Sequence, residues 1–89
     1  MDDKKQKIYE LIEDITYSRI DEDRKIYPWI TLTMLSYILP YIENTIVSRL
    51  SELSRIDRKI VFNKKKKICR LSRHVDFKLV DNYFIFQKG

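Results

Sequence analysis

The chain has 89 residues, of which 44% are hydrophobic and 35% charged, and its formal net charge is +5. A chain this short has room for one hydrophobic core, so residues 1–89 are expected to form a single domain. The hydrophobic content excludes wholesale disorder. No apolar run approaches the ~20 residues that span a bilayer, and the charged N-terminus does not fit a signal peptide. The single cysteine favours a reducing compartment, so we expect a cytoplasmic protein without a membrane partner.

The basic residues are concentrated in one part of the chain. Residues 55–73 hold nine Lys or Arg and a single acid, Asp57, which gives this stretch a net charge of +8. The positive charges of such a patch repel one another unless an anion neutralises them. The usual polyanions are nucleic acid and an acidic membrane face. The alternative is a solvated, lysine-rich loop.

The first predicted element is a helix over residues 3–17. Its apolar residues fall at positions i, i+3, i+4 and i+7, one face of a 3.6-residue period, and are Ile8, Leu11, Ile12 and Ile15. Residues 18–28 are polar and charged and end in a proline, which predicts a loop or an extended arm.

Two shorter helices are predicted next. The second begins after an N-cap at Thr31 or Thr33 and ends before Pro40, because proline cannot continue the helix ladder. The third begins at Glu43 or Asn44, with Asn44 as a good N-cap, and runs to about Arg55. Their predicted buried stripes are Leu32, Leu35 and Leu39 in the second helix and Ile46, Leu50 and Leu53 in the third.

Beyond residue 55 the pattern becomes typical of β-structure. Residues 59–62 and 68–71 predict two strands joined by a charged turn at 63–67. A single helix over 56–71 is the competing interpretation, although it would leave a polar gap on its buried face. A second hairpin is predicted at 75–86, where apolar residues on both sides of Asp81-Asn82 alternate in one consistent register.

No catalytic or metal-binding constellation is evident. Cys69 is expected to be buried in a strand, and together with His74 it does not make up a zinc-ligand set. The sequence also lacks a glycine-rich phosphate loop and a convincing acid–base pair, so we expect no enzyme activity and no cofactor.

The order of these elements resembles the winged helix-turn-helix family. Residues 31–39 are similar to the second helix of such domains, and residues 43–53 are similar to their recognition helix. The resemblance covers about residues 5–71. It implies an α+β fold in which three helices are followed by β-hairpins, and a protein that binds double-stranded DNA, with the third helix in the major groove.

The resemblance also implies a set of DNA-contacting residues. Arg49 is the residue expected to contact guanine, because its planar guanidinium can donate hydrogen bonds to two acceptors of that base. The turn lysines would lie against the DNA backbone or the minor groove. The full predicted set is Thr33, Asn44, Thr45, Ser48, Arg49, Arg55, Lys64, Lys65, Lys66, Lys67, Arg70 and Arg73.

Several roles are compatible with this interpretation. The protein is expected to be a transcriptional regulator, and the alternatives are a centromere-binding adaptor in DNA segregation or a protein-interaction module on the same fold. A homodimer is expected, because one recognition helix contacts only a few base pairs. The N-terminal helix or the aromatic hairpin at 75–86 would supply the dimer contact.

Overall fold

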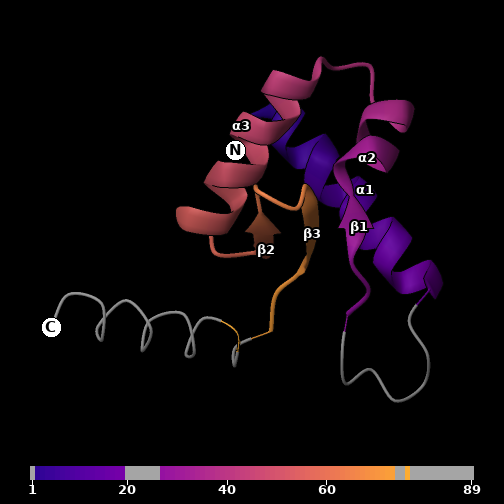
Figure 1. The fold of residues 1–89 in the computed structure, drawn as a ribbon, viewed down its shortest axis with the longest axis vertical. Coiled ribbons are helices and arrows are strands. Elements are labelled where there is room, and N and C mark those ends of the chain that lie inside the picture. Colours follow the sequence, from indigo (N-terminus) through magenta and orange to yellow (C-terminus); the bar gives the residue numbers. More distant parts are fainter. Residues whose placement is uncertain (1, 20–26, 74–75, 77–89) are drawn as a thin grey trace, which may run out of the picture.

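The computed structural model describes residues 2–19, 27–73 and 76. Within these residues the chain forms an α+β fold with three helices and a small three-stranded antiparallel sheet (Figure 1). The elements follow the order α1 (Asp3–Arg19), β1 (Ile30–Thr31), α2 (Leu32–Ile38), α3 (Glu43–Arg55), β2 (Ile60–Asn63) and β3 (Ile68–Leu71). This arrangement is compatible with a winged helix. The predicted hairpin at 75–86 falls almost entirely outside the described residues.

Helix α1 supplies one wall of the core. It runs two residues beyond the predicted end at Tyr17, and Ile8 and Ile12 on its predicted face are fully buried. Thr16 is buried on this face as well, and its hydroxyl donates a hydrogen bond to the Ile12 carbonyl at 2.6 Å. This bond offsets the cost of placing a hydroxyl in an apolar environment.

The ends of α2 follow the predicted chemistry. Of the two candidate caps it is Thr31 whose side chain accepts a hydrogen bond from the Met34 backbone N–H, at 3.2 Å. The helix ends at Ile38, and Leu39 adopts an extended conformation (φ −84°, ψ 142°). Residues before a proline favour that conformation, so Pro40 accounts for the end of the helix.

Helix α3 begins at Glu43, and the predicted N-cap is wrong. Ile42 occupies the N-cap position and makes no side-chain hydrogen bond, while Asn44 lies inside the first turn with its side chain exposed. Three residues of α3 are fully buried, as the periodicity predicts: Ile46, Leu50 and Leu53.

The basic hairpin predicted at 59–71 is confirmed, and the alternative of one helix over 56–71 is wrong. Strand β2 pairs with β3 from Ile60↔Leu71 to Asn63↔Ile68. The tip is a turn over residues 64–67, in which Lys67 is left-handed (φ 56°). The Asn63 side-chain carbonyl accepts a hydrogen bond from the Lys66 N–H at 3.0 Å, and this contact stabilises the turn.

A third strand, β1, was not predicted. It has only two residues, and it pairs antiparallel with β3 through Ile30↔Cys69 and Thr31↔Ile68. The next backbone N–H, that of Leu32, donates to the Lys67 carbonyl at 2.9 Å. The hairpin is therefore hydrogen-bonded to the start of α2 as well as to its own strands.

The core lies between the helices and the sheet. It is built by side chains from every described element, namely Ile8, Ile12, Ile30, Leu32, Leu35, Ile46, Leu50, Leu53, Ile60, Cys69 and Leu71. The burial predicted for Cys69 in a strand is confirmed, and burial raises the pKa of its thiol to about 12.

Truncating Leu50 to Ala is expected to lower the free energy of unfolding by about 2–5 kcal/mol, because the deletion leaves a cavity in a fully buried position. Ile56→Ala is the matched control. The Ile56 side chain is 72% exposed, so its loss should change the free energy of unfolding by less than about 0.5 kcal/mol. Denaturant unfolding followed by circular dichroism measures both, and equal effects would contradict this core.

Candidate nucleic-acid interface

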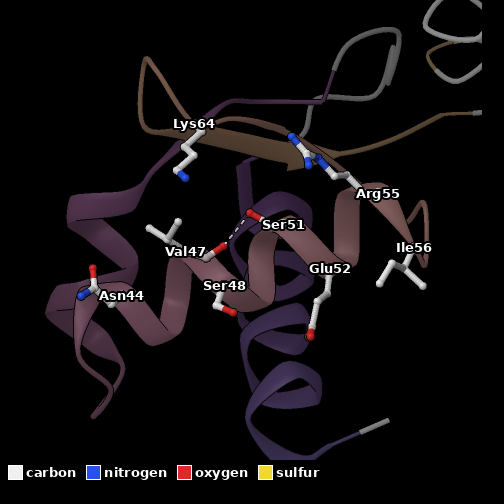
Figure 2. A pocket seen from close by; sticks show the side chains of 8 residues that line it. All are labelled: Asn44, Val47, Ser48, Ser51, Glu52, Arg55, Ile56 and Lys64. Carbon is white, nitrogen blue, oxygen red and sulfur yellow. Dashed lines mark hydrogen bonds between the residues drawn. The ribbon is translucent and has the colours of Figure 1, made fainter. Parts of the chain in front are cut away.

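A groove of about 550 Å³ lies between the outer face of α3 and the turn of the β2–β3 hairpin (Figure 2). We call it the α3 groove. Its lining residues are Asn44, Val47, Ser48, Ser51, Glu52, Arg55, Ile56 and Lys64. Four residues of the predicted DNA-contacting set, Asn44, Ser48, Arg55 and Lys64, therefore come together in one place although they belong to two elements.

Most of the α3 residues in the groove form two rows, because residues four apart lie on the same face of a helix. The outer row is Asn44, Ser48 and Glu52. The inner row is Val47, Ser51 and Arg55, which lies closer to the hairpin (Figure 2).

The two rows differ in which polar groups are already engaged. In the inner row, the Ser51 hydroxyl donates to the Val47 carbonyl at 3.0 Å. In the outer row, the Asn44 and Ser48 side chains are exposed and form no hydrogen bond with any described residue. The uncharged polar groups that remain open to a ligand therefore lie in the outer row.

Four exposed cations lie at the end of α3 and on the hairpin turn, and two of them, Arg55 and Lys64, line the groove. Arg55, Lys64, Lys65 and Lys66 are exposed, and none of them forms an ion pair with a described residue. Lys67 differs, since its ammonium lies 3.7 Å from Glu43 Oε1. The turn thus presents three consecutive free ammonium groups.

Arg49 does not point outward as predicted and does not line the groove. Its side chain is 27% exposed, with Nε 3.1 Å from Asp2 Oδ2 and Nη1 3.9 Å from Glu52 Oε2. The reason is that the N-terminus of α1 packs beside α3, and the periodicity of α3 alone does not reveal this contact.

Lys5 extends this network of charges. Its ammonium lies 2.9 Å from Asp57 Oδ2 and 3.9 Å from Glu52 Oε2, and the hydrogen bond with Asp57 raises the pKa of Lys5. The backbone N–H of Lys5 donates to Asp2 at 2.8 Å and lowers the pKa of that carboxyl group, with Arg49 acting in the same direction. Sequence reasoning missed Asp2 and Lys5, since both are remote from α3 along the chain.

Arg70 does not line the α3 groove either. Its guanidinium forms a bidentate pair with Asp76 at 2.8 and 2.9 Å and stacks 4.9 Å from the centre of the Trp29 ring. Its side chain is only 13% exposed. The backbone N–H of Arg73 donates to the same carboxylate at 2.7 Å. Arg70 and Arg73 therefore join the end of β3 to Asp76 and lie outside the α3 groove.

The remaining predicted residues are scattered. Thr33 is exposed on α2 and Thr45 is half-buried on α3, and neither lines the groove. Sequence reasoning left Val47, Ser51, Glu52 and Ile56 out of the predicted set, although the i, i+4 spacing from Asn44 would have indicated Glu52.

Comparison with protein-family models, with curated proteins and with solved structures finds no match for this chain. In the described part of the chain, no group of three or more His, Cys, Asp or Glu is placed to hold a metal ion. Nor does any helix in that part have the length and apolar character needed to cross a membrane.

Asp76→Asn is expected to lower the free energy of unfolding at neutral pH by about 1.5–3 kcal/mol, since hydrogen bonds from a charged group are lost. The same change should weaken the acid dependence of stability. The Arg70 guanidinium holds the pKa of Asp76 below its ordinary value of 3.8. The pair of Asp76 with Arg70 therefore stabilises the fold fully above the ordinary pKa of the carboxyl group. This stabilisation is lost as the pH falls through the lowered pKa.

Unfolding of both proteins between neutral and strongly acidic pH tests this. The difference between wild type and Asp76→Asn should shrink as the pH falls below the ordinary carboxyl range. A difference that stays constant at all pH values would contradict the ion pair.

Proposed function

We propose that this chain is a winged-helix protein that binds double-stranded DNA and acts as a sequence-specific regulator of transcription. Helix α3 would enter the major groove, and the turn of the β2–β3 hairpin would lie on the phosphate backbone. One observation carries the proposal. Two exposed cations without ion-pair partners among the described residues, Arg55 on α3 and Lys64 on the turn, line a single groove, and the exposed Lys65 and Lys66 follow Lys64 on the same turn.

The acids around the groove support a polyanionic ligand, because each lies near a cation of the chain itself. Glu43 is paired with Lys67 at 3.7 Å, and Glu52 lies 3.9 Å from both Lys5 and Arg49. The lining of the groove holds two cations, Arg55 and Lys64, against one acid, Glu52, so the lining is net positive. Positive clefts attract polyanions over a distance.

The dimensions of α3 also suit duplex DNA. Its 13 residues give a helix roughly 20 Å long, and the major groove of B-DNA is about 12 Å wide, which admits one α-helix. The free amide and hydroxyl groups of the outer row would then face base edges. A homodimer remains part of the proposal, since two α3 helices one DNA turn apart would contact a longer site.

The salt dependence of DNA binding tests the proposal. Each phosphate neutralised releases counterions, and the slope of log K against log salt is about −0.9 for each phosphate on B-DNA. Four contacting cations predict a slope of roughly −3.6 per protomer. Lys64→Ala should reduce the magnitude of the slope by about 0.9, and removal of Lys64, Lys65 and Lys66 together should reduce it by about 2.7.

Lys7→Ala is the control for Lys64→Ala. Lys7 is exposed on α1, two residues after Lys5 and so on nearly the opposite side of the helix from α3. Its removal should leave the slope unchanged. Fluorescence anisotropy with a labelled random duplex at several salt concentrations measures all the variants. Equal slopes for wild type and the triple variant would exclude the hairpin turn from the interface.

A second candidate function, protein interaction, is favoured by an apolar surface at the turn between α2 and α3. Tyr37 is 91% exposed, Ile42 71% and Ile38 52%. These residues belong to a run of 17 residues, 26–42, that contains no charged side chain in a chain that is 35% charged. Exposed apolar residues that cluster in this way are typical of interaction surfaces.

Tyr37→Ser tests whether this surface contacts a second copy of the chain. If the surface serves in binding a second copy of the chain, the substitution should weaken the dimer seen by sedimentation velocity at micromolar concentrations and leave the affinity of one protomer for DNA unchanged. Identical sedimentation of wild type and variant would show that Tyr37 contacts no second copy.

A further inference from the structure

We infer that the two rows of the α3 groove have different partners on the duplex. The outer row contacts base edges, with Asn44 on an adenine and Glu52 on a cytosine, and the inner row together with Lys64 contacts the sugar-phosphate backbone. This inference rests on the proposed function and adds the bases that the site selects.

The inner row has the chemistry of a backbone contact. Arg55 on this row and Lys64 opposite it are exposed cations without partners in the described chain. The same row holds the Val47 side chain and the Ser51 hydroxyl, whose proton already bonds the Val47 carbonyl. The row therefore offers charge without a free neutral donor. Phosphates respond to charge and carry no sequence information.

The outer row has the opposite character, because it contains no cation. The Asn44 amide is exposed and unbonded among the described residues, and it offers one donor and one acceptor side by side. That pair matches N7 and N6 of adenine in the major groove. The Ser48 hydroxyl can donate or accept, so it is compatible with any base at the position between.

Glu52 gives the outer row its second specific contact. Lys5 Nζ and Arg49 Nη1 each lie 3.9 Å from Glu52 Oε2, and this oxygen is the acceptor that the row presents. A carboxylate repels phosphate and can only accept hydrogen bonds, so it fits a base that presents a donor. In the major groove the N4 amino group of cytosine is such a donor.

The spacing of the row sets the spacing of the bases. Asn44 and Glu52 are eight residues apart, which is about 12 Å along a helix. Base pairs are stacked every 3.4 Å, so the adenine and the cytosine would lie roughly three to four base pairs apart.

Selection from a pool of randomised duplexes tests the inference with wild type, Asn44→Ala, Glu52→Gln and Asp57→Asn. Thermal unfolding first establishes that each variant is folded. The wild type should enrich sites with an adenine and a cytosine at this separation. On sites with one base exchanged, its affinity should fall by about 5- to 150-fold.

Each variant should lose one preference only. Asn44→Ala should tolerate any base in place of the adenine. Glu52→Gln should lose the preference for cytosine and favour an adenine at that position, because a side-chain amide pairs with N6 and N7 of adenine. Glu52→Gln should also bind random duplex more tightly, because a negative charge leaves the groove. Asp57→Asn is the matched control, since it removes a carboxylate that contacts Lys5 outside the groove lining, and it should keep both preferences.

The failure of this inference differs from the failure of the proposed function. A wild type that binds duplex DNA with the expected salt slope but enriches no adenine and cytosine would overturn the inference alone. Unchanged preferences in Asn44→Ala and Glu52→Gln would overturn it as well. A wild type that binds no duplex would overturn both.

Discussion

The burial of Ile46, Leu50 and Leu53 determines how α3 is turned about its own axis. All three side chains are fully buried in the core shared with α1, α2 and the sheet. With this stripe fixed, the 3.6-residue period leaves the rows that begin at Asn44 and Val47 on the outside. A rotation of α3 by one position would expose leucines and bury polar side chains. The packing of the core therefore determines which residues of α3 line the groove.

The second wall of the groove depends on how the hairpin is attached to the helices. β1 pairs with β3, and the Leu32 N–H that follows β1 bonds the carbonyl of Lys67 in the turn. Glu43 at the start of α3 lies 3.7 Å from the ammonium of the same residue. The turn is thus held at its last residue from two sides, while Lys64 to Lys66 extend beyond these contacts. This arrangement keeps Lys64 beside α3, and none of the three ammonium groups has an ion-pair partner among the described residues.

The elements that the sequence predicts well are those whose signal is local. The three helices, the Thr31 cap and the basic hairpin follow from apolar period, capping chemistry and alternation within a few residues. β1 has too few residues to show an alternation, and it exists because β3 offers an edge to pair with. The internal contacts of Arg49 and Arg70 were not predicted. Asp2 is distant from Arg49 in the sequence, and the packing of α1 on α3 brings the two together. Asp76 is only six residues from Arg70, but it falls in the segment predicted as the second hairpin, and the Trp29 ring reaches Arg70 only through the pairing of β1 with β3.

The net charge of residues 55–73 overstates the number of cations that are available to a ligand. Several of its nine cations are engaged within the fold: Lys59 lies over the Tyr9 ring at 4.9 Å, Lys67 pairs with Glu43, and Arg70 pairs with Asp76. These contacts hold the sheet to α1, to α3 and to the segment after β3. Counterion release depends on the phosphates that a protein neutralises, and cations committed to internal partners contribute little to it. Under the proposed function, the cations without ion-pair partners among the described residues would set the strength of DNA binding, and the formal charge of the segment overestimates it.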